Sequence, residues 1–196
     1  MNTNISHLPE QKRQELQQAL EIIQDEINLD MLILFGSYAR GDWVEDIDEK
    51  TLLPKYQSDF DLLVVTQTPY QAMKTESNNK LKQRLIKEVH RTPTSLIAED
   101  INFINKRLRK SQYFYIDIFR EGKMLYDSGK LELTEPREIT LKERKKIAQE
   151  DFEYWFSKAG KYKKYSDIAL NEKDKNESAF FLHQSVESFI ARIHSL

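Results

Sequence analysis

The sequence predicts a mixed α/β fold followed by an all-helical segment. Two apolar runs, at residues 31–35 and 62–65, have the length of buried strands. Around them, apolar residues recur at helical spacing. Beyond residue 139 only the helical pattern continues. We therefore expect a small mixed sheet flanked by helices, and then a helical unit.

Each element of the sheet domain has a local signal. In chain order, we expect a helix at 9–28, strands at 31–35 and 62–65, a helix from Thr68-Pro69, a strand at 94–98, helices at 101–108 and 113–119, and a short strand at 123–126. The expected core faces of the first two helices hold Leu16, Leu20, Ile23 and Ile27, and Met73, Leu81, Leu85 and Val89. The sheet domain is expected to span residues 1–128.

A change of composition separates this domain from the helical segment. Residues 129–139 contain Pro136 and alternating charges, which indicates a linker. The helical segment is then expected at 140–196. It opens with Thr140 and Glu143, which have the spacing of a capping box.

The second helix of this segment is expected at 178–196. Two antiparallel helices bury little apolar surface alone, so we expect the helical segment to be incomplete by itself. We also expect it to mediate a homo-oligomer, because its apolar residues need a further surface to pack against.

Composition limits the possible classes of protein. The 196 residues include 32 acidic and 30 basic side chains, a net charge of −2, so no broad surface for nucleic acid is indicated. The absence of cysteine excludes disulfides and thiolate metal sites. No apolar run approaches the roughly 20 residues of a membrane span. We expect a cytoplasmic protein without membrane association.

One constellation of residues indicates chemistry. Gly36 and Ser37 follow the first strand, and Asp59 and Asp61 flank the start of the second. Glycine lets the backbone approach an anion, and amides and a hydroxyl donate hydrogen bonds to phosphate. Side chains alternate along a strand, so both aspartates are expected on one face, where a pair of carboxylates suits Mg²⁺. Arg40 could add positive charge to this phosphate and metal site.

The segments GSYARGDW and SDFDLLVV resemble the signature of nucleotidyltransferases of the DNA polymerase beta superfamily. They look most similar to the small bacterial enzymes that are fused to, or encoded beside, a HEPN helical domain. Residues 113–129, 144–159 and 180–187 also resemble the fused proteins. The resemblance therefore covers most of the chain and implies a nucleotidyltransferase fold followed by a partial HEPN bundle.

The resemblance implies transfer of a nucleoside monophosphate from an NTP, expected to be ATP, to an acceptor hydroxyl. Gly36 and Ser37 would hold phosphates, Arg40 would offset charge, and Asp59 and Asp61 would bind Mg²⁺ or Mn²⁺ and serve as the catalytic residues. The acceptor would be a protein side chain, as in antitoxins that modify a HEPN toxin, or a small molecule such as an aminoglycoside.

The sequence departs from the family pattern in two places. Residues 44–57 are inserted between the two halves of the signature, begin with acidic residues, and are expected to form a surface loop or a short hairpin beside the site. They could shape the choice of acceptor. The acidic start at Glu45, Asp46, Asp48 and Glu49 would suit a cationic one.

The second departure concerns a third carboxylate, which the superfamily carries on a later strand. Here Thr94 or Ser95 occupies the expected position. Glu99 and Asp100 follow and are candidates for this role, although Asp100 also fits the N-cap of a helix starting at Ile101, the interpretation we favour. The alternative hypothesis is therefore a catalytically degenerate nucleotide-binding and protein-interaction module of a toxin–antitoxin type system.

Overall fold

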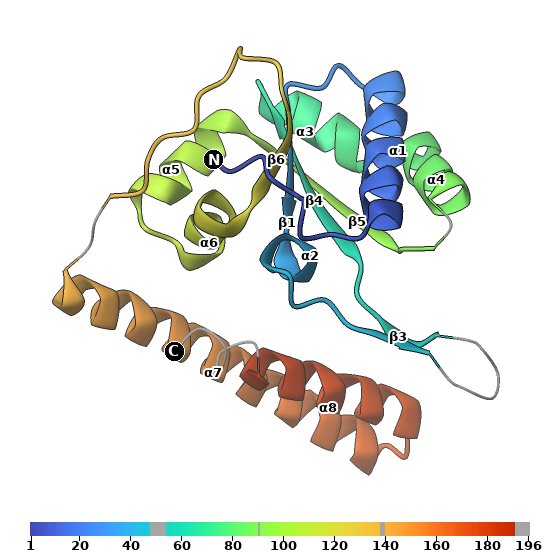
Figure 1. The fold of residues 1–196 in the computed structure, drawn as a ribbon. Coiled ribbons are helices and arrows are strands. Elements are labelled where there is room, and N and C mark those ends of the chain that lie inside the picture. Colours follow the sequence, from blue (N-terminus) through green and yellow to red (C-terminus); the bar gives the residue numbers. More distant parts are fainter. Residues whose placement is uncertain (48–53, 90, 138–139, 191–196) are drawn as a thin grey trace. The chain divides into compact units, whose positions relative to one another are not determined.

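A four-stranded mixed sheet forms the centre of the first part of the molecule (Figure 1). The computed structural model describes residues 1–47, 54–89, 91–137 and 140–190. Its contacts divide the chain into two units, Met1–Arg137 and Glu138–Leu196. The predicted α/β fold with a following helical segment is confirmed.

The strand order in the sheet is β5-β4-β1-β6. The strands are β1 (Met31–Phe35), β4 (Phe60–Thr66), β5 (Thr94–Asp100) and β6 (Lys123–Asp127). The central strand β1 pairs antiparallel with β4 and β6, whereas β4 and β5 are parallel. Because Phe35 lies opposite Asp61 in the β1–β4 register, the end of β1 and the start of β4 meet at one edge of the sheet.

Helices cover both faces of the sheet. They are α1 (Glu10–Glu26), α2 (Gly36–Arg40), α3 (Pro69–Glu76), α4 (Asn79–Glu88), α5 (Ile101–Arg109) and α6 (Tyr113–Glu121). Leu32 and Leu34 of β1 pack into the core with α1, α3 and α4, while Met31 and Ile33 pack into the core with α5 and α6. Figure 1 shows α1 and α4 on one side of the sheet and α5 and α6 on the other. The two cores follow from the alternation of side chains along a strand.

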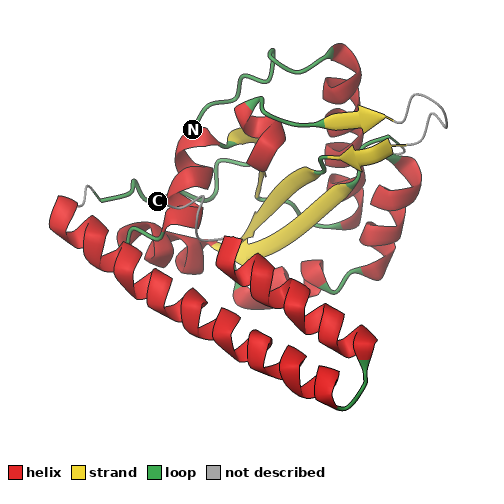
Figure 2. Cartoon of the chain, turned by 90° about the horizontal axis from the view of Figure 1, so that it is seen from below, coloured by secondary structure: helices red, strands yellow, loops and turns green. Residues whose placement is uncertain are grey.

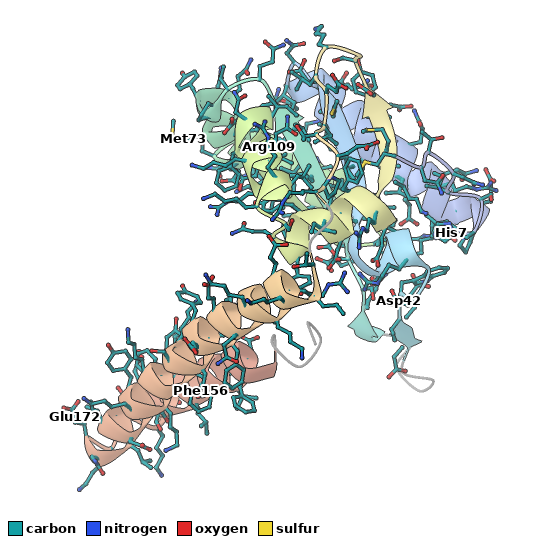
Figure 3. The ribbon with its side chains drawn as sticks, turned by 90° about the vertical axis from the view of Figure 1, so that its left-hand side faces the viewer. His7, Asp42, Met73, Arg109, Phe156 and Glu172 are labelled. Atoms are coloured by element: carbon teal, nitrogen blue, oxygen red, sulfur yellow. The ribbon has the colours of Figure 1, made fainter. Side chains whose placement is uncertain are left out.

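Where the sequence predicts one helix after the second strand, the structure has two, α3 and α4. This difference corrects the prediction that Met73 lies in the core. The Ser77 hydroxyl donates to the Met73 carbonyl (2.9 Å) where α3 ends, and the Asn78 side chain caps α4 by accepting from the Leu81 amide (3.0 Å). The chain therefore changes direction between the two helices. As a result Leu81 and Leu85 are buried as expected, but Met73 is 60% exposed on the outer surface of α3 (Figure 3).

The inserted segment contains a short hairpin, as one of the two alternatives predicted. Strand β2 (Glu45–Ile47) pairs antiparallel with β3 (Pro54–Gln57). Asp48 and Glu49, two of the four predicted acidic residues, lie outside the described residues. The base of the insertion is closed by Ser58, whose amide donates to the Val44 carbonyl (2.9 Å) and whose hydroxyl accepts from the Val44 amide (3.0 Å).

Part of the segment predicted as a linker packs on the first unit. The Asn105 side chain of α5 donates to the Glu132 carbonyl (2.9 Å) and accepts from the Thr134 amide (2.7 Å). Leu131 and Leu133 pack against the core formed with α5 and α6. Residues 129–137 are thus held by side-chain contacts, which composition alone did not indicate.

The second unit is a pair of helices, α7 (Leu141–Asn171) and α8 (Lys175–Ile190), that lie side by side (Figures 1 and 2). The predicted capping box is present, since Thr140 Oγ1 accepts from the Glu143 amide (3.2 Å) and the Glu143 carboxylate accepts from the Thr140 amide (2.9 Å). A tight turn at Glu172 joins the helices (Figure 3). Within the described ranges, no helix combines the length and apolarity needed to cross a membrane.

Candidate active site

Gly36 begins α2 directly after β1 and is placed against Asp61. Its φ is +72°, and a Cβ built on it would lie 2.2 Å from Asp61 Oδ2. Any other side chain would therefore be strained and would displace the carboxylate. Ser37 is partly exposed in the same turn. The sequence-predicted Gly-Ser turn and the second aspartate are thus brought together.

Asp59 and Asp61 flank Phe60, whose side chain is fully buried. Asp61 is partly buried, and this burial, followed by the negative charge of Asp59, raises the pKa of Asp61 to about 6. The two carboxylates are therefore close enough to repel each other. Such a pair gains stability when a cation lies between its members.

Arg40 supplies positive charge at the end of α2. Its Nε donates to Asp42 Oδ2 at 3.1 Å. Its charge also opposes the rise in the pKa of Asp61. The structure thus brings together four of the predicted positions around one edge of the sheet, and Ser37 adjoins them in the chain.

A family model described as polymerase beta, nucleotidyltransferase matches residues 17–130. This range covers more than half of the chain and includes the glycine turn and both aspartates. The chain belongs to the polymerase beta nucleotidyltransferase family. No curated protein and no solved structure matches the chain. The nucleotidyltransferase part of the predicted resemblance is confirmed, while the likeness of residues 140–196 to HEPN domains stays a prediction.

The turn of this nucleotidyltransferase is supported by Tyr38, which is fully buried. Its ring stacks on Trp43 (centroids 5.4 Å apart, planes at 12°) and contacts Phe60 (4.6 Å). Its hydroxyl donates to Glu45 Oε1 at 3.2 Å. Tyr38 therefore links the Gly36–Ser37 turn to β4 and to the first residue of the hairpin.

The structure does not bring Glu99 and Asp100 to this site. In the β4–β5 register, Ser95 lies opposite Asp61, whereas Glu99 and Asp100 lie opposite Val65 and Thr66. At ~3.3 Å per residue, Glu99 is about 13 Å further along the strand. Asp100 instead caps α5, accepting from the amides of Asn102 and Phe103 (both 3.1 Å), as the favoured interpretation predicted.

Across the part of the chain that the structure describes, no group of three or more acidic, histidine or cysteine side chains is arranged to hold a metal ion. The site edge therefore offers two carboxylates as potential ligands. Mg²⁺ in phosphate-transferring sites is held by one or two carboxylates together with substrate phosphates. Asp59 and Asp61 fit that arrangement only if the nucleotide completes it.

A pocket of about 220 Å³ adjoins the glycine turn and was not predicted. Its lining comprises Phe35, Gly36, Arg40, Phe114, Asp117, Ile118, Glu121 and Gly122. Burial, followed by the charge of Glu121, raises the pKa of Asp117. The sequence signal was weak, because two carboxylates four residues apart on a helix are common on solvated surfaces.

Proposed function

We propose that this nucleotidyltransferase transfers a nucleoside monophosphate from a metal-bound NTP, with ATP as the expected donor, to an acceptor hydroxyl. The observation that carries the proposal is the contact between Gly36 and the Asp61 carboxylate, beside Asp59. A turn that exposes backbone to an anion then lies next to a carboxylate pair that needs a cation.

The residues of the site would act mainly by positioning. Asp59 and Asp61 would hold Mg²⁺ or Mn²⁺, which, when bound, would neutralise charge on the phosphate oxygens. Gly36 and Ser37 would donate hydrogen bonds to the outer phosphates, and Arg40 would offset the charge of the departing pyrophosphate. The acceptor oxygen would form a bond to the α-phosphorus, and the bond from that phosphorus to the oxygen bridging the α- and β-phosphates would break. Pyrophosphate would leave, and the proton of the acceptor hydroxyl would pass to solvent.

The acceptor belongs to one of two classes under this proposal, a protein side chain or a small molecule. The hairpin that begins at Glu45 lies next to the turn at Gly36 and Ser37, called the phosphate turn from here on, through the contact with Tyr38. Its first two residues are acidic, and whereas Glu45 is paired with Lys12, Asp46 is exposed; the Asp46 carboxylate favours an acceptor that carries positive charge near its hydroxyl.

Calorimetric titration of each NTP with Mg²⁺ tests the proposal before an acceptor is known. The wild-type chain is compared with Asp59→Asn/Asp61→Asn and with a matched control, Glu21→Gln/Asp25→Asn, which removes two exposed charges from α1. We expect the site variant alone to lose affinity by roughly 10²-fold or more. Equal binding by the site variant, or Mg²⁺-dependent transfer that it retains, would contradict the proposal.

A second candidate is a nucleotide-binding interaction module without turnover. Two observations favour it: Ser95 lies opposite Asp61 where the family carries a carboxylate, and large aromatic side chains such as Phe156 are exposed on the helical unit. This candidate predicts nucleotide binding without product, together with self-association or a partner on the helical unit. Intact-mass analysis after incubation with acceptors, and sedimentation velocity over a range of concentrations, distinguish it. A strict monomer would count against it.

A further inference from the structure

A buried ammonium group lies where the segments of the site meet. Lys12 of α1 is 6% exposed and forms an ion pair with Glu45, the first residue of the hairpin. Its Nζ donates to Thr92 Oγ1 at 2.6 Å, and the Thr92 hydroxyl donates to Glu15 Oε2 at 2.5 Å. Lys12 thus joins α1 to the hairpin and to the segment that enters β5.

The same ammonium group also faces the phosphate turn. Lys12 Nζ is 5.6 Å from the centre of the Tyr38 ring, within reach of a cation–π interaction. The Tyr38 hydroxyl donates to the carboxylate with which Lys12 is paired. Lys12, Glu45 and Tyr38 therefore form one connected cluster, called the Lys12 cluster. Tyr38 directly follows Ser37 in the chain.

The charges of the Lys12 cluster are mutually dependent. Burial alone would raise the pKa of Glu45, but the hydrogen bond and charge of Lys12 outweigh it and lower the pKa. Burial, followed by the charge of Glu45, raises the pKa of Tyr38, so that its hydroxyl stays protonated and donates. Removing the ammonium group would take away the positive charge that Glu45 contacts directly and that Glu15 reaches through the Thr92 hydroxyl.

We propose that Lys12 and Glu45 are positioning residues for nucleotide binding, because together they fix Tyr38 and hence the phosphate turn. Tyr38 transmits the constraint in two directions. Along the chain it precedes Ala39 and Arg40. Through its ring it contacts Phe60, which separates the two aspartates. Small displacements of a phosphate-binding turn have large effects on affinity and rate.

Helix α1 offers a matched control at its other end. The Glu26 side chain is 8% exposed and pairs with Lys80 Nζ and Arg84 Nη1, both at 2.9 Å. These partners lie on α4, and not in the segment Gly36–Arg40 that holds the phosphate turn. Glu26→Ala thus removes two ion pairs from the same helix, and its effect on nucleotide binding measures the effect of lost stability alone.

The experiment is titration of Mg²⁺–ATP into the full chain, with urea unfolding of each variant. We expect Glu45→Ala to raise Kd by about tenfold, whereas Glu45→Gln, which still accepts from Tyr38, restores most of the affinity. Lys12→Met should raise Kd in the same way. Glu26→Ala should lower the unfolding midpoint and leave Kd unchanged.

An unchanged Kd in Glu45→Ala would overturn this inference, as would an equal rise of Kd in Glu26→Ala. The inference rests on the proposed nucleotide binding, and the two can fail separately. Absence of Mg²⁺–ATP binding by the wild-type chain contradicts the proposed function. Normal binding by the wild type with an indifferent Glu45→Ala contradicts the positioning role alone.

Discussion

The two units of the molecule bury different kinds of side chain. The first unit encloses large residues such as Tyr38 and Phe60, both fully buried. In the second unit, the side chains that the structure describes as buried are small, namely Ala159, Ala169, Ser166, Ser178 and Ser188. Many of its large side chains are exposed, among them Phe152, Tyr154, Phe156, Phe180 and Phe189. The comparison shows that the sheet domain contains its own core of large side chains, whereas the helical pair leaves many of its large apolar side chains exposed.

The largest expected effect is on the free energy of unfolding, and it should differ between alanine variants of the two units. Phe60→Ala should lower the free energy of unfolding of the first unit by roughly 3–5 kcal/mol, because it leaves a cavity beneath the site. Phe156→Ala, at a side chain that is 56% exposed, should cost less than about 1 kcal/mol. Urea unfolding followed by fluorescence measures both, since the two tryptophans, Trp43 and Trp155, lie in different units.

Single-tryptophan variants assign the signals. Trp155→Phe leaves the reporter of the first unit, and Trp43→Phe leaves that of the second. If Phe156→Ala cost as much as Phe60→Ala, the helical pair would already be covered in solution. The contrast between the units would then describe an isolated chain and not the assembled protein.

A second prediction concerns Asp61, whose ionised form makes the first unit less stable than a neutral side chain would. The pKa of Asp61 is raised to about 6 from an ordinary 3.8, so its stabilising contribution is complete below the unfolded value and is lost as the pH rises through the folded value. Asp61→Asn should therefore stabilise the metal-free protein above about pH 7 by roughly 1–2 kcal/mol, a value reduced for partial exposure. The gain should vanish below about pH 4.

Unfolding of both proteins across this pH range, with and without Mg²⁺, measures the effect. Addition of Mg²⁺ and ATP should restore stability to the wild type and not to Asp61→Asn. Stabilisation that is independent of pH would indicate a packing effect of the amide. It would contradict the interpretation that the two carboxylates destabilise the protein until a cation binds between them.

The smallest expected effect is at Asp100. Its carboxylate accepts two amide hydrogen bonds at the start of α5, so Asp100→Ala should cost about 1 kcal/mol. Nucleotide binding should be unchanged, because Asp100 lies at the far end of β5 from Asp61. A loss of Mg²⁺–ATP affinity in this variant, relative to Asp100→Asn, would reopen the question of a third carboxylate.

Local patterns in the sequence predicted the sheet and the juxtaposition of its two signature halves. Strand alternation and the glycine turn are properties of neighbouring residues, so Gly36, Asp59 and Asp61 could be placed without a structure. The break between α3 and α4 was missed because the cap at Asn78 competes with a continuous helical pattern. The Lys12 cluster was missed because the hydrogen bond from Lys12 to Thr92 joins residues 80 positions apart, and periodicity does not report which polar side chains meet.

The paired hydrogen bonds between Val44 and Ser58 have a consequence for how this protein could diversify. They fasten the two ends of the inserted segment just before Asp59. Because the entropic cost of closing a loop grows slowly with its length, segments of different size could be grafted between these anchors. The carboxylates of Asp59 and Asp61 would keep their register. The insertion could thus vary in length beyond Glu45 without moving the carboxylates, as long as Glu45 keeps its ion pair with Lys12 and its hydrogen bond from Tyr38.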